Sequence, residues 1–351
     1  MKVAIIISRI EPLGPVKVIQ ALVNSLSKNQ ELKINVFYID KKVDPEMKMM
    51  VPVERLDRKT FNFSEYDIIH TNGIRPDLFA FRNRKKIKYH ISTIHNFVFE
   101  DLSFTYNKVI SLIFGNIWLI LWRRADKLIC VSNSLKIYYE KWYPSSKFEV
   151  IYNGIPESVN SIAADNDFVL KFGEFKSKGY KVLGSAGILT KGKGIDLVIK
   201  LIAAEKEFAV IIIGNGKELY NLKQLAEKLG VSNRCVFYGF SCNAVNYYEY
   251  FDFFIMPSRS EGFGLAMLEA VQQKVPVVCS DLAVFYELFN NEEVTFFKSG
   301  DLKSLSEALD IANETCNKKV DLAFTRYLNN YTNTLMAKQY LELFQSTCLA
   351  I

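Results

Sequence analysis

The chain has 351 residues, of which 49% are hydrophobic and 23% are charged. This length corresponds to about two domains, and the composition excludes a disordered chain, a collagen-like repeat and a small disulfide scaffold. The net charge of +6 is uneven, because residues 1–160 carry 24 basic and 16 acidic residues whereas the rest carry 20 and 22. The basic excess of the N-terminal half indicates an anionic surface or partner there.

The N-terminal half alternates apolar runs with helical patterns. Val3–Ile7 is apolar without alternation, which is typical of a central parallel strand, and Val16–Leu26 has helical spacing. Further strands are predicted at Ile34–Ile39, Tyr66–His70, Tyr89–Ile94, Lys127–Val131 and from Phe148, with a helix from about Ser132. This order predicts a doubly wound α/β domain. Residues 156–178 are polar and lack sustained periodicity, which predicts a linker.

A second alternating series follows the predicted linker. Its strands are expected at Lys181–Ala186, Ala209–Ile213, Arg234–Tyr238, Phe253–Met256, Val275–Cys279 and Val294–Phe297. Its helices are expected at Gly194–Glu205, Lys217–Leu229, Gly264–Gln273 and Leu302–Asn313. We therefore predict two Rossmann-like domains, residues 1–160 and 161–330, which face a central cleft at the carboxyl ends of their strands. Residues 331–351 are interpreted as a last helix that packs back on the first domain.

Two features bear on cellular location. Met1-Lys2 leads directly into a short apolar run, so no cleavable signal peptide is expected. The six cysteines contain no C-x-x-C pair, and there are only three histidines. We therefore expect reduced thiols, no metal site and a cytoplasmic protein.

The most informative stretch is Met256–Ala270, which follows an apolar strand and opens a helix. Its two glycines allow close backbone approach, and the first N–H groups of the helix, with the positive end of its dipole, suit a diphosphate. Glu269, one turn further, suits two hydroxyls of a ribose, and Glu261 suits a second sugar. The alternative is an ordinary helix start with an acidic residue that favours the dipole. The two glutamates, eight residues apart around this turn, argue against that alternative.

This Glu-x7-Glu pattern around Gly-Phe-Gly-Leu resembles the signature of the retaining nucleotide-sugar glycosyltransferases of family 4, which have the GT-B fold. Further segments resemble the family in order and spacing: Ala125–Ser132, Val150–Ile155, Gly187–Gly194, Ile213–Gly216, Val236–Gly239 and Pro276–Glu287. Together these segments cover most of the chain. They are specific for the family but not for its sugar.

The resemblance implies a role for each matching residue. Glu261 and His95 are the implied catalytic residues, and Glu269 is implied to bind the donor ribose. The donor diphosphate is implied to lie on Lys193 and on the backbone amides of Gly262, Phe263, Gly264 and Leu265. Loops at Gly14, Lys191 and Gly214 are implied to border donor or acceptor, with no metal and no cofactor besides the nucleotide sugar. The alternative for His95 is an ordinary core or loop histidine.

The sequence departs from the family at three places. Ile188 stands where the family has an arginine, and a lost charge-assisted hydrogen bond costs roughly 1.5–3 kcal/mol. Lys191 supplies a point charge there but not a guanidinium fork. Pro15 removes one amide after Gly14, and Ala283-Val284 replaces a pair of small residues. These departures concern donor affinity rather than reaction class. Asp165-Asn166-Asp167 has an Asp-x-Asp spacing but is interpreted as solvated surface.

Residues Val109–Trp122 contain 11 apolar residues out of 14, whereas a membrane-spanning helix needs about 20. Two interpretations remain open: a buried helix of the first domain, or a helix at a bilayer interface with Trp118 and Trp122 at headgroup depth. A basic cluster nearby in sequence favours an anionic leaflet; it consists of Arg82, Arg84, Lys85, Lys86 and Lys88. Without an aromatic platform, a nucleic-acid partner is disfavoured.

The sequence therefore predicts a retaining transferase that moves a sugar from a nucleotide-diphosphate sugar to a lipid-linked glycan, in lipopolysaccharide or surface-polysaccharide synthesis. The second domain is expected to bind the donor and the first the acceptor, at the inner face of a membrane. Two alternatives stay open: a nucleotide-sugar 2-epimerase of the same architecture, and a non-catalytic partner protein. A dehydrogenase is disfavoured, because no G-x-G-x-x-G follows the first strand of either domain.

Overall fold

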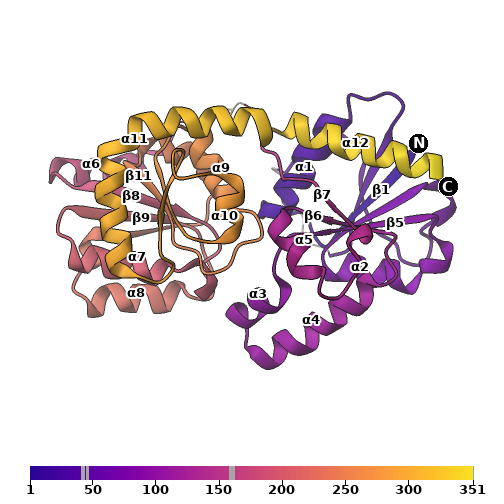
Figure 1. Cartoon of the computed structure of the whole chain (residues 1–351), viewed down its shortest axis with the longest axis horizontal. Helices are drawn as coiled ribbons and strands as arrows, with labels where there is room; N and C mark the ends of the chain where they lie inside the picture. The colour runs from indigo at the N-terminus through magenta and orange to yellow at the C-terminus, as the bar shows by residue number, and fades with distance from the viewer. Residues whose placement is uncertain (41–43, 45–46, 158–162, 351) are drawn as a thin grey trace. The chain divides into compact units, whose positions relative to one another are not determined.

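The structure is a computed structural model that describes residues 1–40, 44, 47–157 and 163–350. It divides into two units. Unit 1 comprises Met1–Leu102, Lys108–Pro156 and Tyr331–Ile351, and unit 2 comprises Ser103–Asn107 and Glu157–Asn330. Each unit is built on one parallel sheet covered by helices (Figure 1), which is the predicted α/β architecture.

The sheet of unit 1 has the order β3-β2-β1-β4-β5-β6-β7, with parallel pairing throughout. Its strands are β1 (Lys2–Ile7), β2 (Lys33–Tyr38), β3 (Val53–Arg55), β4 (Ile68–Asn72), β5 (Tyr89–Ile94), β6 (Lys127–Cys130) and β7 (Phe148–Val150). Its helices are α1 (Gly14–Leu26), α2 (Ile74–Arg82), α3 (Val98–Thr105), α4 (Lys108–Trp122), α5 (Asn133–Tyr139) and α12 (Asn333–Ala350), although the end of α3 belongs to unit 2.

The last helix, α12, returns to unit 1 and packs along α1 (Figure 1). Asn333 at its start donates to the Ser25 hydroxyl at 2.9 Å, and Thr332 forms an isolated parallel bridge with Ile155. Tyr340 in the same helix is buried against β5, where its hydroxyl lies 3.2 Å from Thr93 Oγ1. The C-terminal residues therefore complete the unit that the N-terminal residues begin.

The sheet of unit 2 has the order β10-β9-β8-β11-β12-β13, again parallel. Its strands are β8 (Lys181–Ala186), β9 (Phe208–Ile213), β10 (Cys235–Gly239), β11 (Phe253–Met256), β12 (Val277–Ser280) and β13 (Thr295–Phe297). Its helices are α6 (Asn166–Ser177), α7 (Ile195–Ala204), α8 (Leu219–Lys228), α9 (Leu265–Gln272), α10 (Ala283–Leu288) and α11 (Leu302–Asn330).

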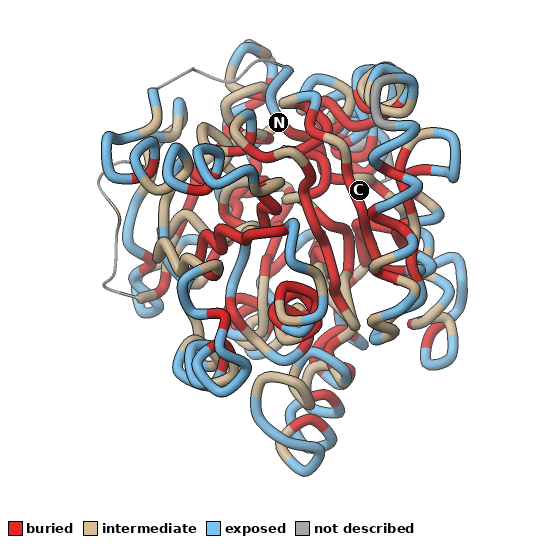
Figure 2. Tube along the Cα trace, turned by 90° about the vertical axis from the view of Figure 1, so that its left-hand side faces the viewer, coloured by how far each residue is buried: buried red, intermediate tan, exposed pale blue. Residues whose placement is uncertain are grey.

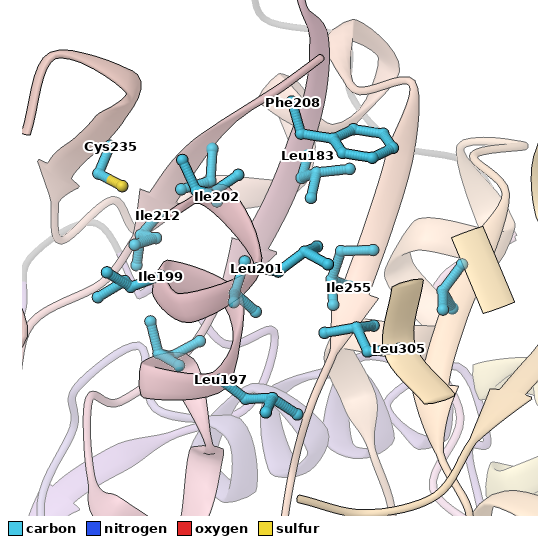
Figure 3. Close-up of a cluster of buried hydrophobic side chains, with 14 of the residues drawn as sticks. Leu183, Leu197, Ile199, Leu201, Ile202, Phe208, Ile212, Cys235, Ile255 and Leu305 are labelled. Atoms are coloured by element: carbon cyan, nitrogen blue, oxygen red, sulfur yellow. The ribbon is translucent and has the colours of Figure 1, made fainter. Parts of the chain in front are cut away.

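Burial explains why the unalternating apolar runs become central strands. Five consecutive residues of β1 and all six of β9 are buried, because helices cover both faces of each sheet. The strands appear as buried segments in Figure 2. In unit 2, side chains of α7 such as Leu201 and Ile202 meet strand residues such as Ile212 and Ile255 in one core (Figure 3).

The predicted linker at residues 156–178 is wrong over its second half, which forms α6. Asp165 caps this helix, since its side chain accepts the N–H of Phe168 at 3.1 Å. The helix buries only Phe168 and Phe175, so its sequence shows little periodicity. Asp165 also accepts hydrogen bonds from the hydroxyls of Tyr238 and Tyr247. This exposed carboxylate therefore links the start of α6 to these two tyrosines and is not only solvated surface. Residues 158–162 of the predicted linker lie outside the described part of the chain.

Candidate functional site

The turn between β11 and α9 has the backbone geometry that the sequence predicts. Gly264, which precedes α9, has φ 107° and ψ 51°, in the left-handed region that favours glycine. A Cβ atom at this position would lie 2.9 Å from a ring carbon of Phe285. The helix begins at Leu265. The N–H groups of Met267 and Leu268 donate to Gly264 O at 3.0 and 3.3 Å, so the N–H groups of Leu265 and Ala266 precede the first hydrogen bonds of the helix. This helix start is therefore suited to an anion.

A second loop, between β8 and α7, is fastened to this turn. Arg259 donates its backbone N–H to Gly192 O at 2.7 Å and its guanidinium to Lys191 O at 2.7 Å. The guanidinium also pairs with Asp196 at 2.8 Å. Gly194 fits closely against the turn, since a Cβ atom there would lie 1.9 Å from Pro257 O. Sequence reasoning missed Arg259, although it stands inside the motif.

These contacts bring two predicted residues together. Lys193 Nζ forms an ion pair with Glu261 Oε1, and the hydroxyl of the buried Ser258 lies 3.2 Å from the same oxygen. The Glu261 side chain is only 11% exposed, whereas that of Lys193 is 31% exposed. The carboxylate is thus held in place, and the ammonium keeps access to solvent.

Glu269 is half-buried in α9 and faces a buried tyrosine. The hydroxyl of Tyr248 lies 3.2 Å from Glu269 Oε2. Burial and the adjacent carboxylate raise the pKa of Tyr248 well above its usual range, so its hydroxyl stays protonated and donates. Tyr248 therefore orients the carboxylate that the sequence assigns to a ribose. The sequence did not predict this role of Tyr248, because Tyr248 and Glu269 are far apart in the sequence.

Glycines at the ends of β8, β9 and β10 let three loops approach one another. A Cβ atom on Gly214, which has φ 152°, would lie 1.9 Å from Gly187 O. Gly214 also donates its N–H to Gly239 O at 2.7 Å. The neighbouring Ile188 is 49% exposed, so an aliphatic side chain meets solvent at the position where the resemblance implies an arginine. Lys191 is exposed, with its carbonyl held by Arg259 as described above.

The remaining predicted residues lie in unit 1. His95 follows β5 and is half-buried, with its Nε2 atom 2.9 Å from Asn72 Oδ1. Burial lowers the pKa of His95 to about 4, so the ring is neutral at pH 7. Gly14 is the first residue of α1, and Pro15 occupies the first turn without a backbone N–H.

The expectation that Trp118 and Trp122 lie at headgroup depth is wrong. Both indole N–H groups donate to Oδ2 of the buried Asp77 in α2, at 2.7 and 2.9 Å. Trp122 is only 1% exposed. The tryptophans face inward because a buried carboxylate needs hydrogen-bond donors.

The opposite side of α4 is apolar and exposed. Its exposed residues are Val109, Leu112, Ile113, Phe114, Ile117 and Ile120, and we call them the α4 face. In the basic cluster, Arg84 is paired with Asp126, and Lys88 is paired with Asp67 at 2.8 Å. Among the described helices, none combines the length and apolar character needed to cross a bilayer.

Comparison with protein families gives two matches. Residues 25–159 match glycosyltransferase family 4, and residues 167–322 match the glycosyl transferases group 1. The O-antigen biosynthesis glycosyltransferase WclY of Escherichia coli is 34% identical, over 99% of this chain and 98% of its own length. The lipopolysaccharide core mannosyltransferase LpsB of Rhizobium meliloti is 34% identical over 36% of this chain and 40% of its own length.

Solved structures match the whole chain. Anabaena HepE in complex with UDP and glucose has a TM-score of 0.78 at 17% identity, covering 99% of this chain and 100% of that one. Sucrose-phosphate synthase of Thermosynechococcus elongatus has a TM-score of 0.81 at 15% identity and covers 100% of both chains. At these identities the matches show the fold, and they confirm the predicted GT-B architecture.

Proposed function

Because this chain belongs to the family 4 glycosyltransferases, a retaining and metal-independent family, we propose that it transfers a sugar from a UDP-sugar to a lipid-linked glycan during O-antigen synthesis. The main support for this proposal is that Lys193 and Glu261 form an ion pair next to the start of α9 in unit 2. A cation, a carboxylate and the backbone N–H groups at a helix start are the chemistry that a sugar diphosphate needs.

The donor is proposed to bind unit 2 through three contacts. Its diphosphate lies against the start of α9 and Lys193, its ribose hydroxyls donate to Glu269, and its sugar hydroxyls donate to Glu261. Uridine is the proposed nucleoside, supported by the UDP that Anabaena HepE binds. The O-antigen pathway is proposed from the relative WclY, which matches nearly the full length of both chains.

The ion pair between Lys193 and Glu261 suggests how the site responds to the donor. A diphosphate carries more negative charge than one carboxylate and competes for the ammonium. Glu261 then exchanges the ammonium for sugar hydroxyls, while Ser258 continues to hold its Oε1 atom. The two residues thus keep each other's charge compensated until the donor arrives.

The transfer is proposed to occur on one face of the sugar. The bond between the anomeric carbon and the diphosphate oxygen breaks, and the acceptor hydroxyl forms its bond to that carbon from the same side. The acceptor proton passes to the departing diphosphate oxygen. Lys193 and the start of α9 stabilise the charge that develops on this leaving group. His95 of unit 1 is proposed to act on the reacting sugar.

Unit 1 is proposed to bind the acceptor and to lie on the anionic inner face of a membrane. The α4 face is the apolar contact. Two exposed cations, Arg123 and Arg124, directly follow the same helix. An apolar helix face continuous with cations is complementary to an anionic bilayer interface.

The test of function incubates the purified chain with UDP-, GDP- or ADP-sugars, with and without a lipid-linked acceptor. We expect transfer from a UDP-sugar only when acceptor is present, with retained configuration in the NMR spectrum of the product. Inverted configuration would overturn the assignment. Turnover of donor alone would favour the 2-epimerase, and absence of nucleotide binding in calorimetry would favour a non-catalytic partner.

A further inference from the structure

Asn72 and His95 stand side by side at the carboxyl edge of the unit 1 sheet. Asn72 ends β4 and His95 directly follows β5, the neighbouring parallel strand, in which Thr93 is paired with Asn72. Ligands of doubly wound sheets bind beyond the carboxyl ends of the strands. Asn72 and His95 are therefore placed where a side chain of β4 or β5 can contact such a ligand.

The contact between the two side chains fixes the proton on the imidazole. His95 Nε2 lies 2.9 Å from Asn72 Oδ1, and an amide oxygen can only accept. Nε2 must therefore carry the hydrogen. The ring is neutral at pH 7, so Nδ1 keeps its lone pair and can accept a hydroxyl proton.

The nitrogen of the Asn72 amide is left without a hydrogen-bond acceptor within the described part of the chain. The side chain is 7% exposed, and its Nδ2 atom has no hydrogen-bond partner among the described residues. A buried donor without a partner is costly and calls for an explanation. The ring nitrogens Nδ1 of His70 and His90 are also unpartnered, but these residues lie within the strands and not at the sheet edge.

We propose that Asn72 and His95 form a sugar-binding pair, in which Asn72 holds His95 in the Nε2–H form and donates its own Nδ2–H to an oxygen of the same sugar. His95 Nδ1 accepts a hydroxyl of that sugar. Asn72 is thereby a positioning residue for His95 and a direct ligand of the substrate. The identity of the ligand as a sugar rests on the proposed function, whereas the tautomer rests on the contact alone.

Two variants distinguish these roles of Asn72 from an effect on folding. Asn72→Ala removes both the acceptor for His95 and the unpartnered donor. Asn83→Ala is the matched control, because Asn83 lies in the same unit but only caps α2, through a 2.9 Å bond from its Nδ2 to Phe79 O. The three tryptophans of the chain all belong to unit 1, so their fluorescence reports whether each variant folds.

The first readout is the imidazole tautomer in the full-length chain. With three histidines in the sequence, nitrogen-15 labelling allows each ring to be assigned by NMR. We expect Nε2–H for His95 in the wild type and a mixture of tautomers in Asn72→Ala, with Asn83→Ala like the wild type. An Nδ1–H form in the wild type would overturn the proposal.

The second readout is kinetic. We expect Asn72→Ala to lower kcat at least tenfold while the Kd for UDP, which unit 2 binds, stays within twofold of the wild type. A folded Asn72→Ala with wild-type kcat would overturn the inference and leave the proposed function intact. A wild-type chain that transfers no sugar would overturn the proposed function, while the tautomer would still be decided by NMR.

Discussion

Glu269 is the residue whose proposed role can be isolated most cleanly. A carboxylate that accepts two ribose hydroxyls contributes about 1.5–3 kcal/mol or more, so we expect Glu269→Ala to weaken UDP binding at least tenfold. Calorimetry with UDP measures this change. Glu227→Ala, on the exposed side of α8, is the control and should bind like the wild type. Equal affinity in both variants would remove the ribose role.

Ile188 offers a gain-of-function test at the same site. Its side chain is 49% exposed, so its replacement sacrifices little packing. We expect Ile188→Arg to tighten UDP binding about tenfold or more, because a guanidinium adds a charge-assisted hydrogen bond to the diphosphate. Ile188→Gln adds polarity without charge and should leave the Kd nearly unchanged. Tighter binding by both variants would point to lost apolar bulk instead.

At this scale the sequence predicted the residues of the proposed donor site but not the contacts that hold their side chains. Lys193, Glu261 and Glu269 follow from motif and chemistry. Arg259 and Tyr248 do not, because each acts on a residue distant in sequence: Arg259 on the loop of Lys191, and Tyr248 on Glu269. Such pairings depend on strand order, which no local spacing reveals.

At the scale of elements, the start of α9 depends on one glycine. Gly264→Ala places a Cβ atom 2.9 Å from Phe285 in a left-handed backbone conformation. We expect it to destabilise unit 2 by about 2–4 kcal/mol and to weaken UDP binding. Gly230→Ala is the control, since Gly230 has φ 69° with no atom within 4 Å of the added carbon, and should cost about 1 kcal/mol. Urea unfolding of both variants measures the difference, and equal losses would show that the contact with Phe285 is unimportant.

The central strands of unit 1 contain two buried histidines that predict acid sensitivity. Burial lowers the pKa values of His70 and His90 from 6.5 to about 3. Below about pH 6.5 these two histidines bind protons in the unfolded chain but stay neutral in the folded chain. The free energy of unfolding therefore falls as pH decreases toward 3. Each histidine contributes a slope of about 1.4 kcal/mol per pH unit within this window. Asp77 acts in the opposite sense, because burial raises its pKa.

His90→Gln tests this slope. Its amide retains a donor for Thr71, which lies 2.8 Å from His90 Nε2, but binds no proton. We expect the loss of stability between pH 6 and pH 5 to be smaller in the variant by about 1.4 kcal/mol. Urea unfolding followed by tryptophan fluorescence measures unit 1 alone, and parallel pH slopes would contradict the prediction.

Elements with a strong hydrophobic pattern in the sequence were predictable, and elements with a weak hydrophobic pattern were not. Apolar runs such as Val3–Ile7 predicted the central strands to within a residue or two. The edge strand β3 was missed because its three residues are half-buried or exposed and carry no pattern. The last long helix of unit 2, α11, extends to Asn330 and not Asn313. Among the described side chains of its second half only Ala323 and Tyr327 are buried, so the sequence there has a weak hydrophobic pattern.

At the scale of the whole molecule, the proposed membrane contact predicts lipid-dependent flotation. We expect the wild type to float with vesicles containing anionic lipid and less with zwitterionic vesicles. Leu112→Gln combined with Ile117→Gln should abolish flotation, because both side chains belong to the α4 face. Leu170→Gln, at a 67% exposed position of α6 in unit 2, is the control.

The charged part of the contact is tested separately. Arg82→Gln combined with Lys85→Gln should reduce flotation with anionic vesicles, since each cation contributes about 1 kcal/mol near such a surface. Arg84 and Lys88 are left intact because their ion pairs serve the fold. Unchanged flotation in all variants, or a dimer that the double α4 variant dissociates, would contradict a membrane role for this helix.

The return of α12 to unit 1 has a consequence for how the protein is made. Unit 1 contains both Met1–Leu102 and Tyr331–Ile351, whereas most of unit 2 is continuous. During translation unit 2 is therefore complete before α12, which packs along α1 of unit 1, has been synthesised. A truncation that removes α12 would therefore damage the unit that contains residues 1–102 and leave unit 2 whole.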